Sequence, residues 1–172
     1  PGEPDTSDPH AVARLICLRL LERRARSRAE LAAQLRRRGV PDDAARTVLD
    51  RFTEVGLIDD AALAGMLAGA HHRERGLARR AVTLKLRQRG LDEQLVAEAV
   101  GAIDADSERH AARRLVAKRL PALAALAPEV RARRLVALLA RRGYPGALAW
   151  EVVRDAVTGP AGLEDADPGP GG

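Results

Sequence analysis

A six-residue phrase occurs three times in this chain of 172 residues. Its copies are Leu35-Arg36-Arg37-Arg38-Gly39-Val40, Leu86-Arg87-Gln88-Arg89-Gly90-Leu91 and Leu139-Ala140-Arg141-Arg142-Gly143-Tyr144, with glycines 51 and 53 residues apart. A period of that size is typical of chains built from stacked copies of one small unit. Because stacked repeats present an extended surface, the repetition favours a binding protein over an enzyme with one catalytic pocket.

The composition indicates that each unit is helical. Ala, Leu, Val and Arg dominate, and all but Val favour helices. Each phrase ends in a glycine, which is the usual residue just past a helix terminus. We therefore expect an all-α fold of three tandem three-helix repeats, nine helices in total, forming an elongated, curved stack. The expected repeats span residues 10–58, 59–103 and 104–157, with disordered tails at 1–9 and 158–172.

Local signals support these boundaries. Ser27 and Glu30 have the spacing of a capping box, in which each side chain accepts a hydrogen bond from the other residue's free amide. The helix that follows should bury Leu31 and Leu35 and end at Gly39. The corresponding core positions in the other repeats are Val82 and Leu86, then Leu135 and Leu139. Since a unit of about 50 residues has little core of its own, neighbouring units should pack together.

No pattern of catalytic or metal-binding residues stands out. The chain has no phosphate-binding loop, no dinucleotide-binding glycine pattern and no serine-hydrolase elbow. The single cysteine, Cys17, lies in an apolar run and is expected to be buried. His71 and His72 are adjacent and point about 100° apart on a helix. Of Asp59 and Asp60, one is expected to cap the next helix. We expect no enzyme activity, no cofactor and no metal site.

The charge distribution points to an anionic partner. The net charge is +5, but the two predicted tails hold six acidic residues and no Lys or Arg, which leaves +11 on the body. Such a body should be attracted to phosphate backbones or to an acidic protein surface. Only Lys85 and Lys118 are lysines; a GC-rich coding sequence explains this bias as well as a need for bidentate pairing does. No apolar stretch approaches the length of a membrane span, so we expect a cytoplasmic protein. We also expect the protein to be a monomer.

Arginines gather at the end of the second helix of every repeat. One cation there would complement the helix dipole, but two or three in each repeat suggest a basic stripe. Arg133 and Arg134 could extend it. Trp150 has no equivalent in the other repeats and is either packed between units or exposed as a partner anchor. The residues predicted to bind a partner or nucleic acid are Arg36, Arg37, Arg38, Arg79, Arg80, Arg87, Arg89, Arg113, Arg114, Arg141, Arg142 and Trp150.

These motifs together resemble a known family. The run Ser27-Arg-Ala-Glu-Leu31, the first copy of the repeated phrase and Val55-Gly-Leu-Ile-Asp-Asp60 are similar to the RecX family of recombination regulators. So are Arg73-Glu-Arg-Gly-Leu77 and Arg141-Arg-Gly-Tyr144. The resemblance covers about residues 11–157 and rests on order, spacing and threefold repetition. The chain departs from the family pattern at Leu63, Leu67 and His71, where an aromatic residue, a Trp and an Arg are usual.

The resemblance implies a regulator of homologous recombination and of the SOS response. RecX-like proteins have a tandem three-helix fold and bind the RecA recombinase in the groove of its filament on DNA. They inhibit ATP hydrolysis and strand exchange and block filament extension, and they have no catalytic centre. The implied partners are the RecA filament and single- or double-stranded DNA, which charge alone would bind without sequence preference.

Two other functions stay open on the residues alone. Glu30-Leu31-Ala32 through Gly56-Leu57-Ile58 also resembles the core of a helix-turn-helix transcription regulator. A winged version would need two strands after Ile58, where we expect a helix, and one recognition helix does not require three repeats. A purely structural helical adaptor, with the arginines as a solvated surface, is the third possibility.

Overall fold

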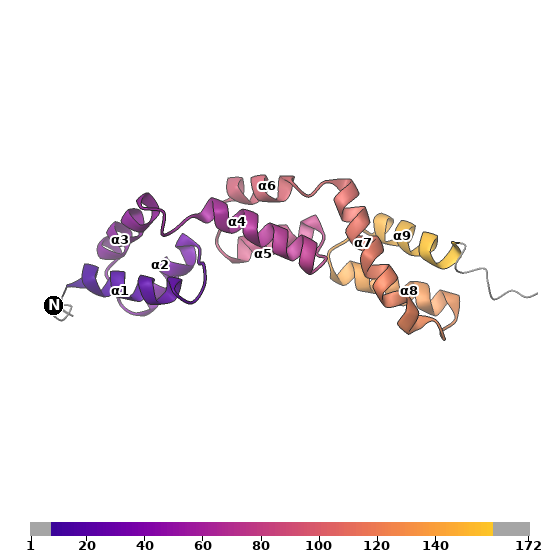
Figure 1. Ribbon diagram of the computed structural model, residues 1–172. Helices are drawn as coiled ribbons and strands as arrows, with labels where there is room; N and C mark the ends of the chain where they lie inside the picture. The colour runs from indigo at the N-terminus through magenta and orange to yellow at the C-terminus, as the bar shows by residue number, and fades with distance from the viewer. Residues whose placement is uncertain (1–7, 160–172) are drawn as a thin grey trace, which may run out of the picture. The chain divides into compact units, whose positions relative to one another are not determined.

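The computed structural model describes residues 8–159, which form nine α-helices and two short helical turns and contain no β-strand. The predicted all-α fold of three three-helix repeats is confirmed (Figure 1). The helices are α1 (Pro9–Leu21), α2 (Arg28–Arg37), α3 (Asp42–Glu54), α4 (Asp60–Gly69), α5 (Arg79–Gln88), α6 (Glu93–Gly101), α7 (Ala105–Arg119), α8 (Pro128–Arg141) and α9 (Gly146–Thr158). A π-helical turn, η1 (Ala70–Glu74), extends α4, and a 3-10 turn, η2 (Leu120–Leu123), follows α7.

The predicted tails were drawn slightly too long. Asp8 is the N-cap of α1, where its Oδ1 accepts a hydrogen bond from the His10 amide at 2.9 Å, and Pro9 is the first helical residue. At the other end α9 continues through Thr158. These residues belong to the fold because they begin and end helices. The rest of both predicted tails, residues 1–7 and 160–172, lies outside the described residues.

The helix starts follow the signals in the sequence. The capping box is present: Ser27 Oγ accepts from the Glu30 amide at 3.1 Å, and the Glu30 carboxylate accepts from the Ser27 amide at 2.9 Å. Asp59 Oδ1 accepts from the Ala62 amide at 2.8 Å, so Asp59 is the residue that caps α4. Each cap satisfies an amide that the helix itself leaves without an acceptor.

The repeated core positions are buried in all three repeats. Within the first repeat α1, α2 and α3 pack on one another, and within the third α7, α8 and α9 do the same (Figure 1). Cys17 is buried in the first of these cores, and burial raises the pKa of its thiol to about 11, which keeps the thiol neutral and apolar. The second-helix leucines and valines with no exposed surface are Leu31, Leu35, Val82, Leu86, Leu135 and Leu139.

The compact units of the chain do not coincide with its repeats. Among the described residues, 8–68 and 83–100 form one compact unit, and 69–82 and 101–159 form the other. The second repeat is therefore divided within α5. This division fits the expectation that a unit of about 50 residues needs a neighbour to complete its core.

In the first unit, the start of α2 is joined to the second repeat through polar contacts. Ser27 Oγ donates to the backbone oxygen of Arg89 at 2.5 Å. The Arg28 amide donates to Asp60 Oδ1 at 2.9 Å. The Arg89 guanidinium forms an ion pair with Glu30 at 2.8 Å, with both side chains less than a quarter exposed. These contacts fix the phrase that ends α5 against the start of α2.

The second unit repeats this junction between the second and third repeats. The Ala78 amide donates to the backbone oxygen of Arg142 at 3.0 Å. The Arg79 amide donates to Glu108 Oε1 at 2.7 Å, as the Arg28 amide does to Asp60 in the first unit. In both units, the start of one repeat's second helix therefore contacts the six-residue phrase of the next repeat.

Tyr144 adds a contact that only the second unit has. Its hydroxyl donates to the backbone oxygen of Gly76 at 3.0 Å inside the protein. Burial raises the pKa of the phenol to about 12, so the hydroxyl keeps its proton and remains a donor at neutral pH. Tyr144 therefore stabilises the junction between the second and third repeats.

The glycines of the phrase are required for two separate reasons. Gly39, Gly90 and Gly143 have φ values of 73°, 69° and 87°, in the left-handed region that side chains disfavour. A Cβ on Gly90 would lie 2.6 Å from the Cβ of Ala29, and one on Gly143 would lie 2.7 Å from the Cβ of Ala81. A Cβ on Gly39 would meet no atom within 4 Å.

These two costs can be separated by substitution. Gly39→Ala should lower the free energy of unfolding by about 1–2 kcal/mol, the cost of the left-handed backbone alone. Gly143→Ala should cost roughly 1–3 kcal/mol more, because the added methyl group collides with Ala81. Urea unfolding followed by circular dichroism measures both. Equal losses in the two variants would contradict the close packing at Gly143.

The Glu30–Arg89 pair predicts a pH dependence. Partial burial alone would raise the pKa of the Glu30 carboxyl, but the Ser27 amide and the Arg89 guanidinium outweigh it and hold the pKa below its usual value. A depressed folded-state pKa means that the stabilisation is complete above the unfolded pKa of about 4.3 and is lost as the pH falls through the folded value.

Glu30→Gln keeps the capping hydrogen bond and removes the charge. It should cost about 1 kcal/mol at pH 7, and the difference from the wild type should shrink below pH ~4. Unfolding in urea at pH 3.5 to 7 measures this. Glu54→Gln is the matched control, because Glu54 pairs with Arg51 on the surface, both side chains are about two-thirds exposed, and such a pair contributes little.

Candidate nucleic-acid and partner interface

The arginines at the end of α2 are exposed. Arg36 and Arg37 lie in its last turn, and neither forms an ion pair with another described residue. Arg38 is the C-cap residue, and its Nη1 donates to Gln34 Oε1 at 3.0 Å. Three positive charges are thus held together at one helix end with their guanidinium groups in solvent.

Other predicted binding residues are engaged inside the chain. Arg87 forms a two-pronged ion pair with Glu93, with nitrogen–oxygen distances of 2.7 and 2.8 Å. Arg89 is 24% exposed and is held by Glu30, and its Nη2 also donates to the backbone oxygen of Ala25 at 3.2 Å. These two guanidinium groups already have partners, so they have less to offer an external anion.

Arg142 is the counterpart of Arg89 in the third repeat. Its Nη1 donates to the backbone oxygen of Arg75, as Arg89 donates to that of Ala25. Arg38, Arg89 and Arg142 all directly precede the glycine of the phrase, and they form the one basic position present in all three copies. That recurrence is the signal in the sequence that could have identified this position as structural.

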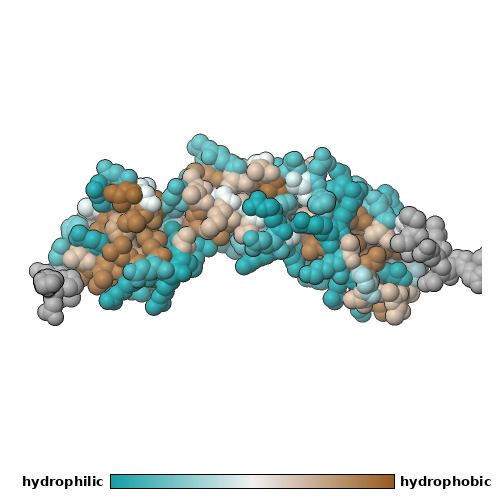
Figure 2. All heavy atoms as spheres, viewed as in Figure 1, coloured by the Kyte–Doolittle hydropathy of each residue, from teal (hydrophilic) through white to brown (hydrophobic). Residues whose placement is uncertain are grey.

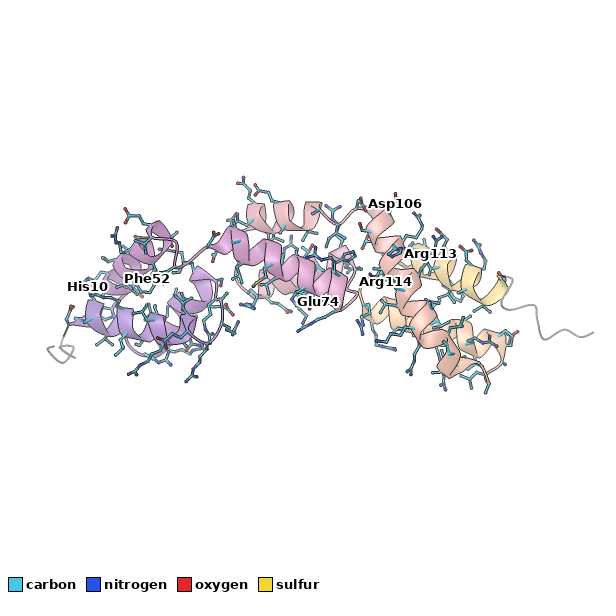
Figure 3. The ribbon with its side chains drawn as sticks, in the orientation of Figure 1. His10, Phe52, Glu74, Asp106, Arg113 and Arg114 are labelled. Atoms are coloured by element: carbon cyan, nitrogen blue, oxygen red, sulfur yellow. The ribbon has the colours of Figure 1, made fainter. Side chains whose placement is uncertain are left out.

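The arginines on α5 and α7 are mostly exposed. Arg79 and Arg80 have exposed side chains in the first turn of α5. Figure 3 labels Arg113 and Arg114 on α7. Arg113 Nη2 lies 4.0 Å from Asp155, and Arg114 Nη2 donates to the backbone oxygen of Arg73 at 3.2 Å. Arg113 therefore has one distant carboxylate partner, and Arg114 is held by one backbone oxygen.

The predicted residues divide between the two compact units. Each unit carries a group of exposed arginines, and a continuous stripe across the whole chain stays a prediction. The first unit holds Arg36, Arg37, Arg38, Arg87 and Arg89. The second unit holds Arg79, Arg80, Arg113, Arg114, Arg141, Arg142 and Trp150.

In the second unit four arginines line a single cleft between α7, η2 and α8. Its volume is about 370 Å³, and none of the described residues that line it is acidic. Hydrophilic residues cover much of the surface over α7 on the face shown in Figure 2. The lining residues are Arg119, Leu123, Arg134, Ala137, Leu138, Arg141 and Arg142. We call this the α7–α8 arginine cleft.

The first unit has a smaller cleft at the corresponding place, between the ends of α1 and α2. It has a volume of about 230 Å³ and is lined by Arg19, Arg23 and Arg38 together with Ile16 and Leu20. Again no described lining residue is acidic. We call this the α1–α2 arginine cleft.

Residue spacing predicts only part of this arrangement. The repeated phrase points to the ends of the second helices, whereas Arg19, Arg23 and Arg119 come from the last part of the first helix of a repeat or just beyond it. Each joins the second-helix arginines through the packing of two helices, which residue spacing does not specify. Arg133 and Arg134 are both expected from the sequence as possible extensions of the stripe, but only Arg134 lines the α7–α8 arginine cleft.

Trp150 is exposed rather than packed between repeats. It is 56% exposed on α9. Beside it lies an apolar hollow of about 370 Å³, also lined by Ala132, Val153 and Val157. Of the two alternatives that the sequence left open, the structure supports the exposed position.

The α4 positions that depart from the family pattern have different environments. Leu63 is buried and Leu67 is half-buried, so Leu63 belongs to the core. His72 is buried, and its Nδ1 lies 2.8 Å from the backbone oxygen of Leu77.

Within residues 8–159, no group of three or more His, Cys, Asp or Glu side chains is placed to hold a metal ion. No helix in that range is long and apolar enough to cross a membrane.

Comparison with protein families decides the relationship. The family models for the first, second and third three-helix domains of RecX match residues 13–52, 59–100 and 106–153. The chain belongs to the RecX family. Each matched range lies within one of the three predicted repeats, and the members of this family are regulators rather than enzymes.

Relatives and solved structures agree with this assignment. The regulatory protein RecX of Thermobifida fusca is 49% identical over 154 residues, which cover 90% of this chain and 83% of the relative. That of Streptomyces coelicolor is 47% identical over 156 residues, covering 91% and 82%. The crystal structure of RecX from Lactobacillus salivarius matches with a TM-score of 0.76 at 15% identity, over 87% of this chain and 97% of that one, which shows a shared fold.

The exposure of Trp150 can be tested directly, because it is the one tryptophan of the chain. Its fluorescence should be quenched by iodide nearly as well as in the urea-unfolded protein, since more than half of the side chain contacts solvent. Stern–Volmer titrations of the folded and unfolded protein measure this. Strong protection from iodide in the folded protein would contradict the exposed position.

Proposed function

We propose that this RecX-family protein regulates RecA in the cytoplasm as a monomer. It binds the RecA filament on DNA and inhibits ATP hydrolysis, strand exchange and filament extension. The single observation that carries the proposal is the match of all three RecX domains, in order, over residues 13–153. Through this action the protein would limit homologous recombination and the SOS response.

The distribution of charge supports contact with a filament that contains DNA. Each compact unit offers exposed arginines with no ion pair to a described residue, Arg36 and Arg37 in one and Arg141 in the other. Contacts to phosphates through such groups are sequence-independent and weaken as salt increases. Because the groups belong to one chain, binding by one raises the effective concentration of the others.

Two earlier alternatives lose support. A winged helix-turn-helix regulator needs strands after Ile58, but α4 begins at Asp60 and no strand occurs in residues 8–159. A purely structural adaptor would not need arginine clusters free of carboxylates. Sequence-specific binding to duplex DNA in a competition assay would restore the first alternative.

A titration of RecA ATPase activity on single-stranded DNA tests the proposal. Substoichiometric to stoichiometric protein should inhibit hydrolysis, and inhibition should weaken at higher salt. The variant Arg36→Glu/Arg37→Glu/Arg141→Glu should need about tenfold more protein, because three exposed charges are reversed.

A control with the same change in charge separates the binding groups from net charge. Arg14→Glu/Arg46→Glu/Arg133→Glu also reverses two exposed arginines in the first unit and one in the second. It should inhibit nearly as well as the wild type. If the wild type neither inhibits hydrolysis nor binds RecA at low salt, the proposed function is wrong.

A further inference from the structure

We infer that the α7–α8 arginine cleft is a binding site for the phosphodiester backbone of nucleic acid. Arg119, Arg134 and Arg141 would pair with phosphate oxygens, and Arg142 would help to fix the cleft. The inference rests on the proposed function in that it names which part of the chain meets the DNA of the filament, but it can be tested without RecA.

The α7–α8 arginine cleft gathers several arginines with no carboxylate among them. Other arginines on the described helices are paired with carboxylates, as in Arg87–Glu93, Arg89–Glu30 and Arg109–Glu151. Here four guanidinium groups border one hollow, and no described lining residue is acidic. Like charges brought together repel one another, and a bound anion removes that repulsion.

Part of the cleft is held in place before any ligand binds. Arg142 lies at the junction between repeats, where its Nη1 donates to the backbone oxygen of Arg75 and its own backbone oxygen accepts from the Ala78 amide. A guanidinium has five N–H donors, so this anchor leaves others for an anion. A positively charged wall that is already fixed loses little conformational freedom on binding.

The lining chemistry favours a phosphodiester backbone over an acidic protein segment. Leu123, Ala137 and Leu138 give the cleft an apolar part, which suits the sugar that follows each phosphate. None of the described residues that line the cleft is aromatic, so none offers a surface on which a base could stack, and binding should not depend on sequence.

Repetition gives a second, independent argument. The α1–α2 arginine cleft lies at the ends of the equivalent two helices in the first repeat and also has no acidic lining residue among those described. Arg38 in that cleft occupies the same position of the phrase as Arg142. A polymer that presents the same charged group at regular intervals can use the same kind of site twice.

The test compares two double variants that remove the same charge from the same two segments. Arg119→Ala/Arg134→Ala removes two lining guanidinium groups. Lys118→Ala/Arg133→Ala removes the charges of their exposed chain neighbours, which do not line the cleft. Alanine is favourable in helices, so both variants should fold, which circular dichroism and thermal unfolding check.

Fluorescence anisotropy with a labelled oligothymidylate, without RecA, gives the affinity at several salt concentrations. Arg119→Ala/Arg134→Ala should bind at least ~10-fold more weakly, and its plot of log K against log salt should be shallower by about 1.4, the value for two lost phosphate contacts on a single strand. Lys118→Ala/Arg133→Ala should bind within about threefold of the wild type and keep the wild-type slope. Arg119→Lys/Arg134→Lys, which keeps the charge, should recover most of the affinity.

Each other outcome has a defined meaning. Equal losses in the two alanine variants would overturn the proposal, since net charge alone would explain them. The same assay can be run with labelled polyglutamate as the probe. If Arg119→Ala/Arg134→Ala lost polyglutamate binding but kept oligonucleotide binding, the proposal would also be overturned and the cleft would be assigned to an acidic protein partner. If the oligonucleotide results are as expected but the wild type leaves RecA ATPase unchanged, the cleft assignment stands and the proposed function fails.

Discussion

In the second and third repeats, the backbone oxygen just before the helix-ending glycine of the phrase holds neighbouring repeats together. In the first unit the oxygen of Arg89 accepts from the Ser27 hydroxyl, and in the second the oxygen of Arg142 accepts from the Ala78 amide. The donors differ, but the acceptor is the same main-chain group in the same position of the phrase. Since a helix leaves its last carbonyl groups without partners, the junction uses acceptors that every helix end provides.

This interaction determines which arginines remain available for a ligand. Docking brings the residue before the glycine next to the preceding repeat, so Arg89 and Arg142 are held by backbone oxygens of that repeat. Arg141, one position before Arg142, is exposed and forms no ion pair with a described residue. Arg38 donates to Gln34 of its own helix and lines the α1–α2 arginine cleft. Arg142 both holds the junction and lines the α7–α8 arginine cleft. A single phrase thus supplies both a structural and a surface arginine.

The sequence specified the local structure well and the site only in part. The buried Leu31, the capping box at Ser27 and the turn at Gly39 follow from helical periodicity and backbone preferences, which act over a few residues. The partners of Arg89 could not be predicted because they include a main-chain oxygen 64 residues away. Every residue has such an oxygen, so the residue type at that position does not show that it accepts a hydrogen bond. Arg119 and Arg134 line one cleft because α7, η2 and α8 pack together, which spacing along one helix does not reveal.

The division of the second repeat has a consequence for how the chain can change in evolution. The segment that was multiplied in the sequence, about 50 residues, is not the segment that forms a compact unit. Residues 83–100 pack with the first repeat and residues 69–82 with the third. Loss of either terminal repeat would leave half of the middle one without its packing partner, exposing apolar side chains such as Leu86 or Val82. We therefore expect loss of a terminal repeat to destabilise the middle repeat as well, so the number of repeats should not change without cost to stability.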